Sequence, residues 1–284
     1  MSEKIDEQTG VETTGHEWDG IEELNNPLPR WWLWTFYATC VWGLAYTIAY
    51  PAWPLVSGAT SGVMGWSTRA NVAAEIEAHE AQNAELVAAL ATADLTTLPP
   101  DLQRYAVQRG AAAFRAQCSQ CHGAGAAGAK GYPNLLDDDW LWGGGIEEIA
   151  YTITHGIRND TDDDAHYSEM PAYGEFMTEE EITSVVEYVV SLSDSSADAA
   201  LVAAGETVFL DNCAACHGED GKGDRSQGAP NLTDAVWLYG GDRETLIETV
   251  TYSRFGVMPA WGQRLSDADV QALSVYVHAL GGGE

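Results

Sequence analysis

The distribution of apolar and polar positions separates one long uncharged stretch from a series of shorter amphipathic segments. Residues 31–56 contain no charged side chain, and aromatic residues such as Trp31 and Trp53 stand near the two ends. About twenty apolar residues are enough for a helix to cross a bilayer, and Trp and Tyr are enriched at both lipid–water interfaces. The pattern therefore predicts one transmembrane helix over residues 31–56, with Pro51 and Pro54 breaking it as it leaves the lipid.

The thirty residues before this stretch form an acidic tail. They carry eight acidic residues and only two basic ones, Lys4 and Arg30. This composition is the opposite of the basic start of a signal peptide. Arg30 adjoins the uncharged stretch, and the nearest basic residue beyond it is Arg69. Because basic residues favour the cytoplasmic side, residues 1–30 are expected to be a cytoplasmic tail.

A linker is expected at residues 57–101. It starts with a Gly- and Ser-rich exit loop. Residues 69–93 are then rich in Ala and Glu and lack Gly and Pro, which predicts a helix. Such a helix serves either as a spacer or as a docking surface for a partner subunit. Residues 95–100 close it.

The rest of the chain contains the same pattern twice. Each copy starts with a helix-like stretch and ends in an amphipathic helix, at residues 179–193 and 267–280, where Ser266 supplies a cap. Between these helices recur Cys-x-x-Cys-His-Gly (118–123 and 213–218), Pro-Asn-Leu (133–135 and 230–232), Trp-Leu-Trp/Tyr-Gly-Gly (140–144 and 237–241) and Met-Pro-Ala-Tyr/Trp-Gly (170–174 and 258–262). A duplicated helical module follows. The predicted fold is mainly α, with two tandem helical domains at residues 102–196 and 197–284.

Charge narrows the range of partners. The 284 residues include 43 acidic and 13 basic ones, which give a formal net charge of −30. Nucleic acid is excluded as a partner, because binding its phosphates requires clustered Lys and Arg. A strongly acidic surface instead attracts a basic protein, and salt weakens that attraction.

The cysteines indicate a covalently held cofactor. In Cys-x-x-Cys-His, two thiols can add to the two vinyl groups of a haem while the adjacent imidazole binds the iron. Zinc would need further Cys or His at suitable spacing, and a redox dithiol needs no following His. The two motifs predict two covalently bound haem c groups per chain, attached through Cys118, Cys121, Cys213 and Cys216 and coordinated by His122 and His217. The fifth cysteine, Cys40, is interpreted as a small buried apolar residue.

The recurring Met-Pro pairs supply candidates for the sixth iron ligand. Met170 and Met258 occupy the same position in the two copies. Met/His coordination raises the haem potential and fills the iron, so no catalytic residue is predicted. His155 aligns with Tyr252 and is therefore interpreted as a local hydrogen-bonding or core residue, and His166 is discounted similarly. The repeat leaves open whether each Met serves the haem of its own copy or that of the other.

The first copy is nine residues longer than the second just before its Met. The extra residues come from 158–168, a run that contains four aspartates, namely Asp160, Asp162, Asp163 and Asp164. Such a run is typical of a solvated loop, and calcium binding is a second interpretation. Our hypothesis is that it lies at the rim of the first haem and guides a basic donor cytochrome.

The order of these parts resembles a known family. An acidic tail, one span, an Ala/Glu helix preceded by Gly65-Trp66-Ser67-Thr68-Arg69 and two cytochrome c modules are similar to the dihaem subunit III (CcoP/FixP type) of cbb3-type cytochrome c oxidases. The string Thr154-His155-Gly156-Ile157-Arg158 adds to the resemblance, which covers nearly the whole chain. Some members of that family have two spans, whereas one is expected here.

The resemblance implies a location and a route for electrons. The tail would be cytoplasmic and residues 57 onward periplasmic, on a bacterial inner membrane. Electrons would come from a cytochrome bc complex through a donor cytochrome c, cross the two haems, and pass to the monohaem and haem–copper subunits that reduce oxygen. The alternatives are a cytochrome subunit of another membrane oxidoreductase, of dehydrogenase or peroxidase type, and a haem-based sensor.

Overall fold

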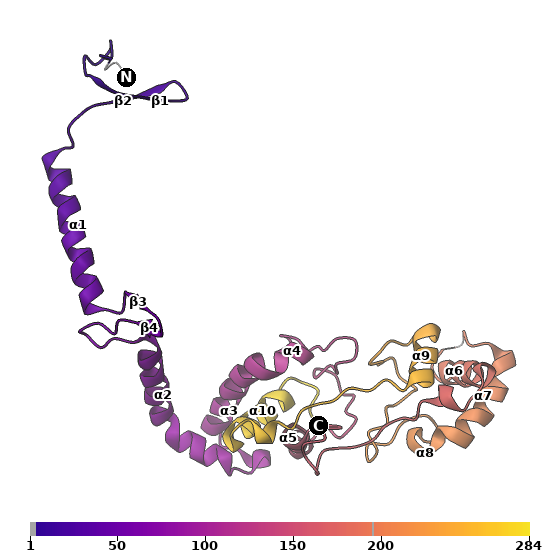
Figure 1. Ribbon diagram of the computed structural model, residues 1–284. Helices are drawn as coiled ribbons and strands as arrows, with labels where there is room; N and C mark the ends of the chain where they lie inside the picture. The colour runs from indigo at the N-terminus through magenta and orange to yellow at the C-terminus, as the bar shows by residue number, and fades with distance from the viewer. Residues whose placement is uncertain (1–3, 195) are drawn as a thin grey trace. The chain divides into compact units, whose positions relative to one another are not determined.

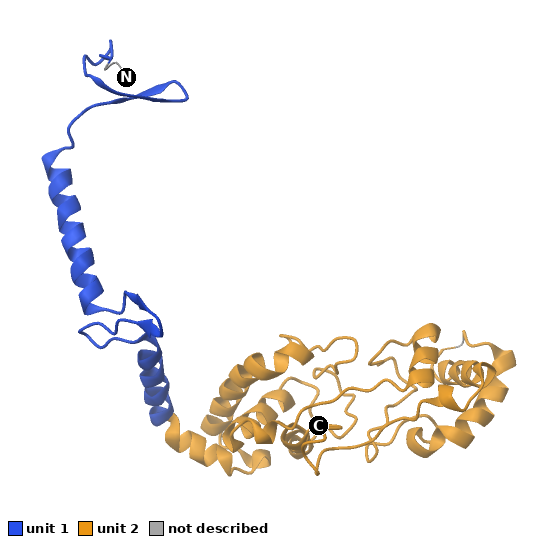
Figure 2. Ribbon diagram, in the orientation of Figure 1, with its two compact units in different colours: residues 1–82 blue, residues 83–284 orange. Residues whose placement is uncertain are grey.

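The computed structural model describes residues 4–194 and 196–284, and most of their regular structure is helical. The chain divides into two compact units, the first ending at Gln82 and the second beginning at Asn83 (Figure 2). The helix α2 (Thr68–Ala91) contains the point of division. It confirms the helix expected over residues 69–93 and ends two residues earlier.

A β-hairpin occupies much of the acidic tail. Strand β1 (Thr13–Trp18) pairs antiparallel with β2 (Ile21–Leu24). Asp19 and Gly20 form the turn with positive φ angles of 51° and 82°. An Asp-Gly pair favours such a turn because both central residues must adopt φ above zero. The hairpin is an addition to the elements expected from the sequence, and this dipeptide was the signal that could have indicated it.

The uncharged stretch forms a helix that is shorter than predicted. Helix α1 (Arg30–Ala49) starts directly after Pro29, and none of its side chains is buried. Strands β3 (Pro54–Leu55) and β4 (Gly58–Ala59) form a small hairpin just after it. The predicted boundary at residue 56 was therefore too late, because the helix ends before Pro51, the first of the two prolines expected to break it. Among the helices of residues 4–194 and 196–284, α1 included, none combines the length and the apolar character needed to cross a membrane.

The second unit holds the repeated modules (Figure 1). Its elements are η1 (Leu95–Thr97), α3 (Pro100–Ala113), a π-helical turn η2 (Phe114–Cys118), α4 (Ser119–His122), α5 (Ile146–His155), η3 (Tyr173–Glu175), α6 (Glu179–Ser191), α7 (Ala199–Asn212), α8 (Ala214–His217), α9 (Arg243–Tyr252), η4 (Trp261–Gln263) and α10 (Asp267–His278).

Side-chain caps fix where the closing helix of each copy begins. Thr178 and Glu181 form a reciprocal capping box at the start of α6. The Asp269 N–H donates to Ser266 Oγ over 3.2 Å at the start of α10, which confirms the cap expected there. Each such bond satisfies a backbone N–H that has no partner within the helix.

The two sequence copies exchange their closing helices. The first helix of copy one, α3, packs against α10 of copy two, and α7 of copy two packs against α6 of copy one (Figure 1). Likewise α5 contacts α10, and α9 contacts α6. The expected boundary between residues 196 and 197 separates the sequence copies, but the packing partners cross it. We call the two packed groups lobe A (α3, η2, α4, α5, η4 and α10) and lobe B (η3, α6, α7, α8 and α9).

Separate apolar cores hold the lobes together. In lobe A, Phe114 and Leu273 are almost fully buried and belong to one cluster. In lobe B, Phe209 packs with Val185 and Val189. Each cluster therefore combines side chains from both sequence copies, so neither copy can complete its core alone.

Two connections cross between the lobes. The backbones of Ile157 and Met258 exchange a pair of hydrogen bonds, each 3.0 Å long. Beside them, the Arg158 Nε–H donates to the Gly256 carbonyl over 2.7 Å and an Arg158 Nη–H donates to the Ser168 carbonyl over 2.9 Å. These bonds fasten the two crossing segments to each other, and both segments lie next to a Met-Pro pair.

Candidate functional site

Each Cys-x-x-Cys-His motif lies at the end of the first long helix of its copy. The last four of its five residues form the short helices α4 and α8, so they turn through about one helical turn. Cys118 and Cys213 are half-buried and pack against the core clusters of lobes A and B, while Cys121 and Cys216 are exposed. In both lobes one thiol thus faces the core and the other faces outward.

The imidazoles of His122 and His217 are held in the same way. His122 Nδ1 lies 3.1 Å from the Pro133 carbonyl oxygen, and His217 Nδ1 lies 3.1 Å from the Pro230 carbonyl oxygen. A carbonyl can only accept, so Nδ1 carries the proton and Nε2 keeps its lone pair. A metal-binding histidine is commonly oriented by such a bond from its other ring nitrogen. Both imidazoles therefore keep an Nε2 lone pair that could bind a metal ion.

Burial favours the neutral imidazole that coordination requires. It lowers the pKa of His122 and of His217, and the hydrogen bond to the prolyl carbonyl opposes this effect only in part. At neutral pH an imidazole with a lowered pKa has a free lone pair rather than a second proton.

A glycine turn brings the prolyl carbonyl to the histidine. The N–H groups of Gly128 and Gly223 donate over 2.8 Å to the carbonyls of His122 and His217, respectively. Their φ angles are +68° and +80°. A Cβ at Gly128 would lie 2.4 Å from a backbone oxygen, and one at Gly223 would lie 2.3 Å from another. Only glycine fits both the conformation and the space.

The half-buried thiols of Cys118 and Cys213 lack the lowered pKa of an activated redox pair. Burial raises the pKa of Cys118 and of Cys213 to about 11. A reactive dithiol needs a thiolate, which a lowered pKa would provide. These thiols fit thioether attachment, which consumes the thiol, better than reversible dithiol chemistry.

Each methionine lies in the lobe that contains the Cys-x-x-Cys-His motif of the other sequence copy. Met258 packs against the lobe A cluster that also includes Cys118. Met170 accepts a hydrogen bond at its carbonyl from the Ser253 hydroxyl, next to α9 of lobe B. Three residues further, the Tyr173 hydroxyl donates over 2.7 Å to the carbonyl of Asn212, the residue before Cys213. Met258 therefore lies with the first motif, and Met170 lies with the second.

The other histidines of this region have local partners. His155 Nδ1 lies 3.1 Å from an Asp162 carboxylate oxygen, and His166 Nε2 lies 3.2 Å from the Thr152 hydroxyl. His155, Asp162 and Asp164 place one possible ligand atom each within 4.8 Å of one another. Asp162 also accepts the Asp164 N–H over 3.0 Å, so hydrogen bonds account for this arrangement.

Cys40 was expected to be a small buried apolar residue, and this prediction was wrong. It is exposed on α1 rather than buried, because α1 presents no buried side chain at all. Its apolar neighbours lie along the same uncovered helix and form no core around it.

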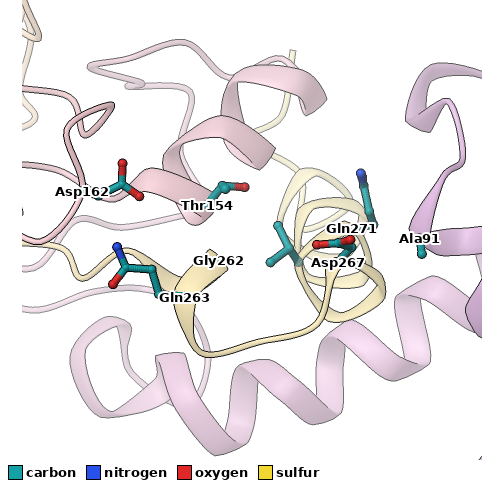
Figure 3. A pocket seen from close by; sticks show the side chains of 8 residues that line it. Ala91, Thr154, Asp162, Gly262, Gln263, Asp267 and Gln271 are labelled. Atoms are coloured by element: carbon teal, nitrogen blue, oxygen red, sulfur yellow. The ribbon is translucent and has the colours of Figure 1, made fainter.

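A cavity beside these elements is separate from the motifs. It has a volume of about 360 Å³ and is lined by residues of α2, α5, η4 and α10 and by Asp162 of the loop after α5. Asp162 and Gln263 lie toward one end and Asp267 and Gln271 toward the other (Figure 3). No residue of either Cys-x-x-Cys-His motif lines it, so neither haem is assigned to this cavity.

Sequence reasoning identified the Pro-Asn-Leu repeat but missed its role. Its structural contribution is a backbone carbonyl, which any residue possesses. The signal that could have revealed it is the position of the prolines shortly after each motif, since Pro133 follows His122 by 11 residues and Pro230 follows His217 by 13. Both spacings are short enough for one loop to fold back over the imidazole.

These features define the class of c-type cytochromes: paired thiols with an adjacent imidazole whose Nε2 is free to bind iron. The family model described as cytochrome c oxidase, cbb3-type, subunit III matches residues 106–189 and again 200–277. That of the N-terminal domain of cytochrome oxidase-cbb3, FixP, matches residues 10–57. The chain belongs to the family of cbb3-type cytochrome c oxidase subunit III proteins.

Curated relatives match along nearly the whole chain. The Cbb3-type cytochrome c oxidase subunit CcoP of Cereibacter sphaeroides is 62% identical over 96% of this chain and 95% of its own length. The subunit FixP of Sinorhizobium medicae is 52% identical over 99% of this chain and 98% of its own. The subunit CcoP of Rhodobacter capsulatus is 52% identical, with both chains fully covered. The mainly helical fold with two tandem cytochrome c-type domains, and their haem c binding, are thus confirmed.

Proposed function

We propose that this chain is the dihaem electron-transfer subunit of a cbb3-type oxidase. It accepts electrons from a basic donor cytochrome c, which a cytochrome bc complex reduces, and passes them to the monohaem and haem–copper subunits that reduce oxygen. The observation that best supports this proposal is the hydrogen bond from the motif histidine to a prolyl carbonyl, which occurs in both copies. It prepares two equivalent iron ligands, one in each lobe.

Haem supplies the reversible one-electron chemistry when bound. The residues of this chain attach it through Cys118, Cys121, Cys213 and Cys216, orient it through His122 and His217, and close the sixth position with methionine. Burial by the two apolar cores limits the access of water, which together with Met/His coordination favours a high potential.

The methionine ligands are exchanged between the sequence copies in this proposal. Met258 would supply the sixth ligand to the iron bound by His122, and Met170 would supply it to the iron bound by His217. Support comes from the packing of Met258 against the cluster that includes Cys118 and from the bond between Tyr173 and Asn212, beside Cys213. The two haem domains are thus assembled from both copies rather than from residues 102–196 and 197–284 separately.

Purification of the full chain with its native partners tests the function. We expect two haems per chain that resist acid–acetone extraction, little response of the reduced spectrum to carbon monoxide, and copurification of a haem–copper core. Strong carbon monoxide binding by one haem would instead support a peroxidase-type or sensor protein, because those need an open iron position. Copurification with a dehydrogenase and no oxidase core would contradict the oxidase assignment.

The aspartate run supplies a docking surface for the donor. Asp160, Asp163 and Asp164 are exposed, whereas Asp162 is engaged by His155. The run lies between Arg158, which is bonded to Gly256, and Met170, in the segment that crosses between lobes. Exposed negative charge there would attract a basic protein and raise its association rate at low salt.

Neutralising two of the exposed aspartates is expected to slow reduction by a basic donor cytochrome. The D160N/D163N variant should reduce the second-order rate by about two- to tenfold at low salt and by little at high salt, where charges are screened. Stopped-flow mixing with the reduced donor measures this rate. A D137N/D138N variant, which alters a different loop by the same charge, is the control. Equal rates for wild type and D160N/D163N at low salt would contradict the docking surface.

Helix α1 is proposed to anchor the chain, as a single pass, to the bacterial inner membrane with its N-terminus cytoplasmic and the haem lobes periplasmic. Trp31, Trp34 and Trp42 are 70%, 73% and 68% exposed. A contiguous exposed apolar surface of this kind marks a membrane or protein interface, and Trp favours the lipid–water boundary.

Replacing the aromatic surface of α1 should release the chain. The triple variant W31S/W34S/W42S is expected to shift the chain from the membrane pellet to the supernatant after alkaline carbonate extraction, because each buried large side chain contributes roughly 1.5–3 kcal/mol. The control V63S/M64S changes exposed apolar residues outside the helix. Retention of the triple variant in the pellet without partner subunits would contradict the anchor.

A further inference from the structure

Two aromatic side chains form reciprocal contacts between the lobes. Trp142 of lobe A lies against Gly228 of lobe B, so closely that a Cβ on this glycine would be 2.2 Å from the indole ring. Tyr239 of lobe B lies against Gly131 of lobe A, where a Cβ would be 3.2 Å from the phenol ring. Each ring therefore covers a glycine of the opposite lobe, and both rings are half-buried.

Each ring also contacts a second side chain. His166 stacks on Trp142 with ring centroids 4.3 Å apart and planes inclined by 13°. The Arg254 guanidinium lies 4.7 Å from the centroid of Tyr239. Stacking and cation–π contacts hold an aromatic ring in one orientation. Each ring thus contacts both a glycine of the opposite lobe and a planar or cationic side chain, and we call each of these two sets of residues a clamp.

The two rings, and the two glycines that they cover, are equivalent positions of the sequence repeat. Trp142 and Tyr239 are 97 residues apart, as are Gly131 and Gly228. His166 and Arg254 are 88 residues apart, the same separation as Met170 and Met258. The contact between lobes is therefore pseudo-symmetric, as in an isologous dimer interface, where the same patch is used twice.

The clamps join the loops that carry the histidine supports. Gly131 precedes Pro133 by two residues, and Gly228 precedes Pro230 by two. Across the interface the Gly131 N–H donates over 2.8 Å to the Leu238 carbonyl, next to Tyr239. The ring of one lobe consequently rests on the loop whose prolyl carbonyl orients the iron-binding histidine of the other lobe.

We propose that Trp142 and Tyr239 are positioning residues that set the distance between the two histidine supports and so the rate of electron exchange between the haems. The inference rests on the proposed function, in which both motifs hold haem. Without the rings, the loops at Gly131 and Gly228 would lose their contacts with the opposite lobe, and the haems would move apart or tilt.

The test uses the full chain purified with its partner subunits. Variants W142L, Y239L and the double variant remove the rings, W142F and Y239F retain an aromatic face, and Y252L removes a tyrosine that is 71% exposed. Hydrogen exchange at the Gly131 amide reports on the interface. Electron equilibration between the haems after rapid partial reduction reports on the positioning.

We expect the double leucine variant to expose the Gly131 amide and to slow equilibration severalfold, because the rate of electron transfer falls exponentially with the distance between the two haems. The phenylalanine variants should restore most of the rate, and Y252L should match wild type. A lost amide protection with an unchanged rate would show a merely structural contact and overturn the proposal. An unchanged protection and rate would overturn it as well.

Haem content separates this proposal from the proposed function. A wild-type chain with other than two haems would refute the function itself, whatever the variants do. If the leucine variants bind fewer haems than wild type, the H166Q variant replaces them in the test, because it removes only the ring that stacks on Trp142. A wild-type equilibration rate in H166Q with two haems bound would overturn the proposal.

Discussion

Replacing Met258 by leucine is expected to remove the sixth ligand of the iron bound by His122, although Met258 belongs to the sequence copy of His217. Leucine has similar volume and no sulfur, so the lobe A cluster that Met258 contacts should stay filled. Loss of the thioether leaves a five-coordinate iron that binds carbon monoxide in its reduced state. The reduced-minus-carbon-monoxide spectrum should change from almost no response to stoichiometric binding by one haem of two.

The identity of the opened haem is read from chains that carry one haem. In a C213A/C216A background only the first motif attaches haem, so M258L should produce carbon monoxide binding and M170L should not. The reverse is expected in a C118A/C121A background. M177L replaces a half-buried methionine outside both repeat positions and serves as the control. If M170L instead opens the haem of the first motif, the exchanged assignment is refuted.

Alanine at Gly110 or Gly205 is expected to destabilise the helical core severely. A Cβ at Gly110 would lie 2.1 Å from the Ala272 carbonyl oxygen of α10, and one at Gly205 would lie 1.9 Å from the Ser184 carbonyl oxygen of α6. Both contacts are far shorter than van der Waals distance and involve backbone, so the helices must move apart. The loss should be about 3–5 kcal/mol, although alanine itself favours a helix by about 1 kcal/mol.

Chemical denaturation of the holo-chain measures this loss as a lower midpoint with an unchanged slope. G125A is the matched control, because a Cβ there meets nothing within 4 Å and its φ is not positive. Its effect should stay within about 0.5 kcal/mol. A loss below about 1 kcal/mol for both G110A and G205A would contradict the close approach of the helices.

The two glycines also explain how the copies pack. Gly110 and Gly205 stand at corresponding positions, 95 residues apart, in the opening helices of the two copies. Each meets a closing helix that comes from the other copy. Because both crossings use the same kind of contact, a pseudo-symmetric pair of lobes results, and the clamps at Trp142 and Tyr239 lie between them.

The sequence by itself determined the local elements and the chemistry. Hydrophobic periodicity and caps predicted the closing helices, now α6 and α10. The Cys-x-x-Cys-His motifs indicated haem c attachment because two thiols and an adjacent imidazole are needed within one turn. Such signals depend only on residues that are close in the chain, and they can therefore be read without a fold.

Only the tertiary structure decided which copy completes which lobe. Both closing helices present similar apolar faces, so either could pack on either opening helix, and the pattern alone favours neither. The same holds for Met170 and Met258, which the repeat makes interchangeable. The prolyl carbonyls of Pro133 and Pro230 were equally invisible, because a backbone oxygen has no side-chain signature and acquires its role only when the loop folds over the histidine.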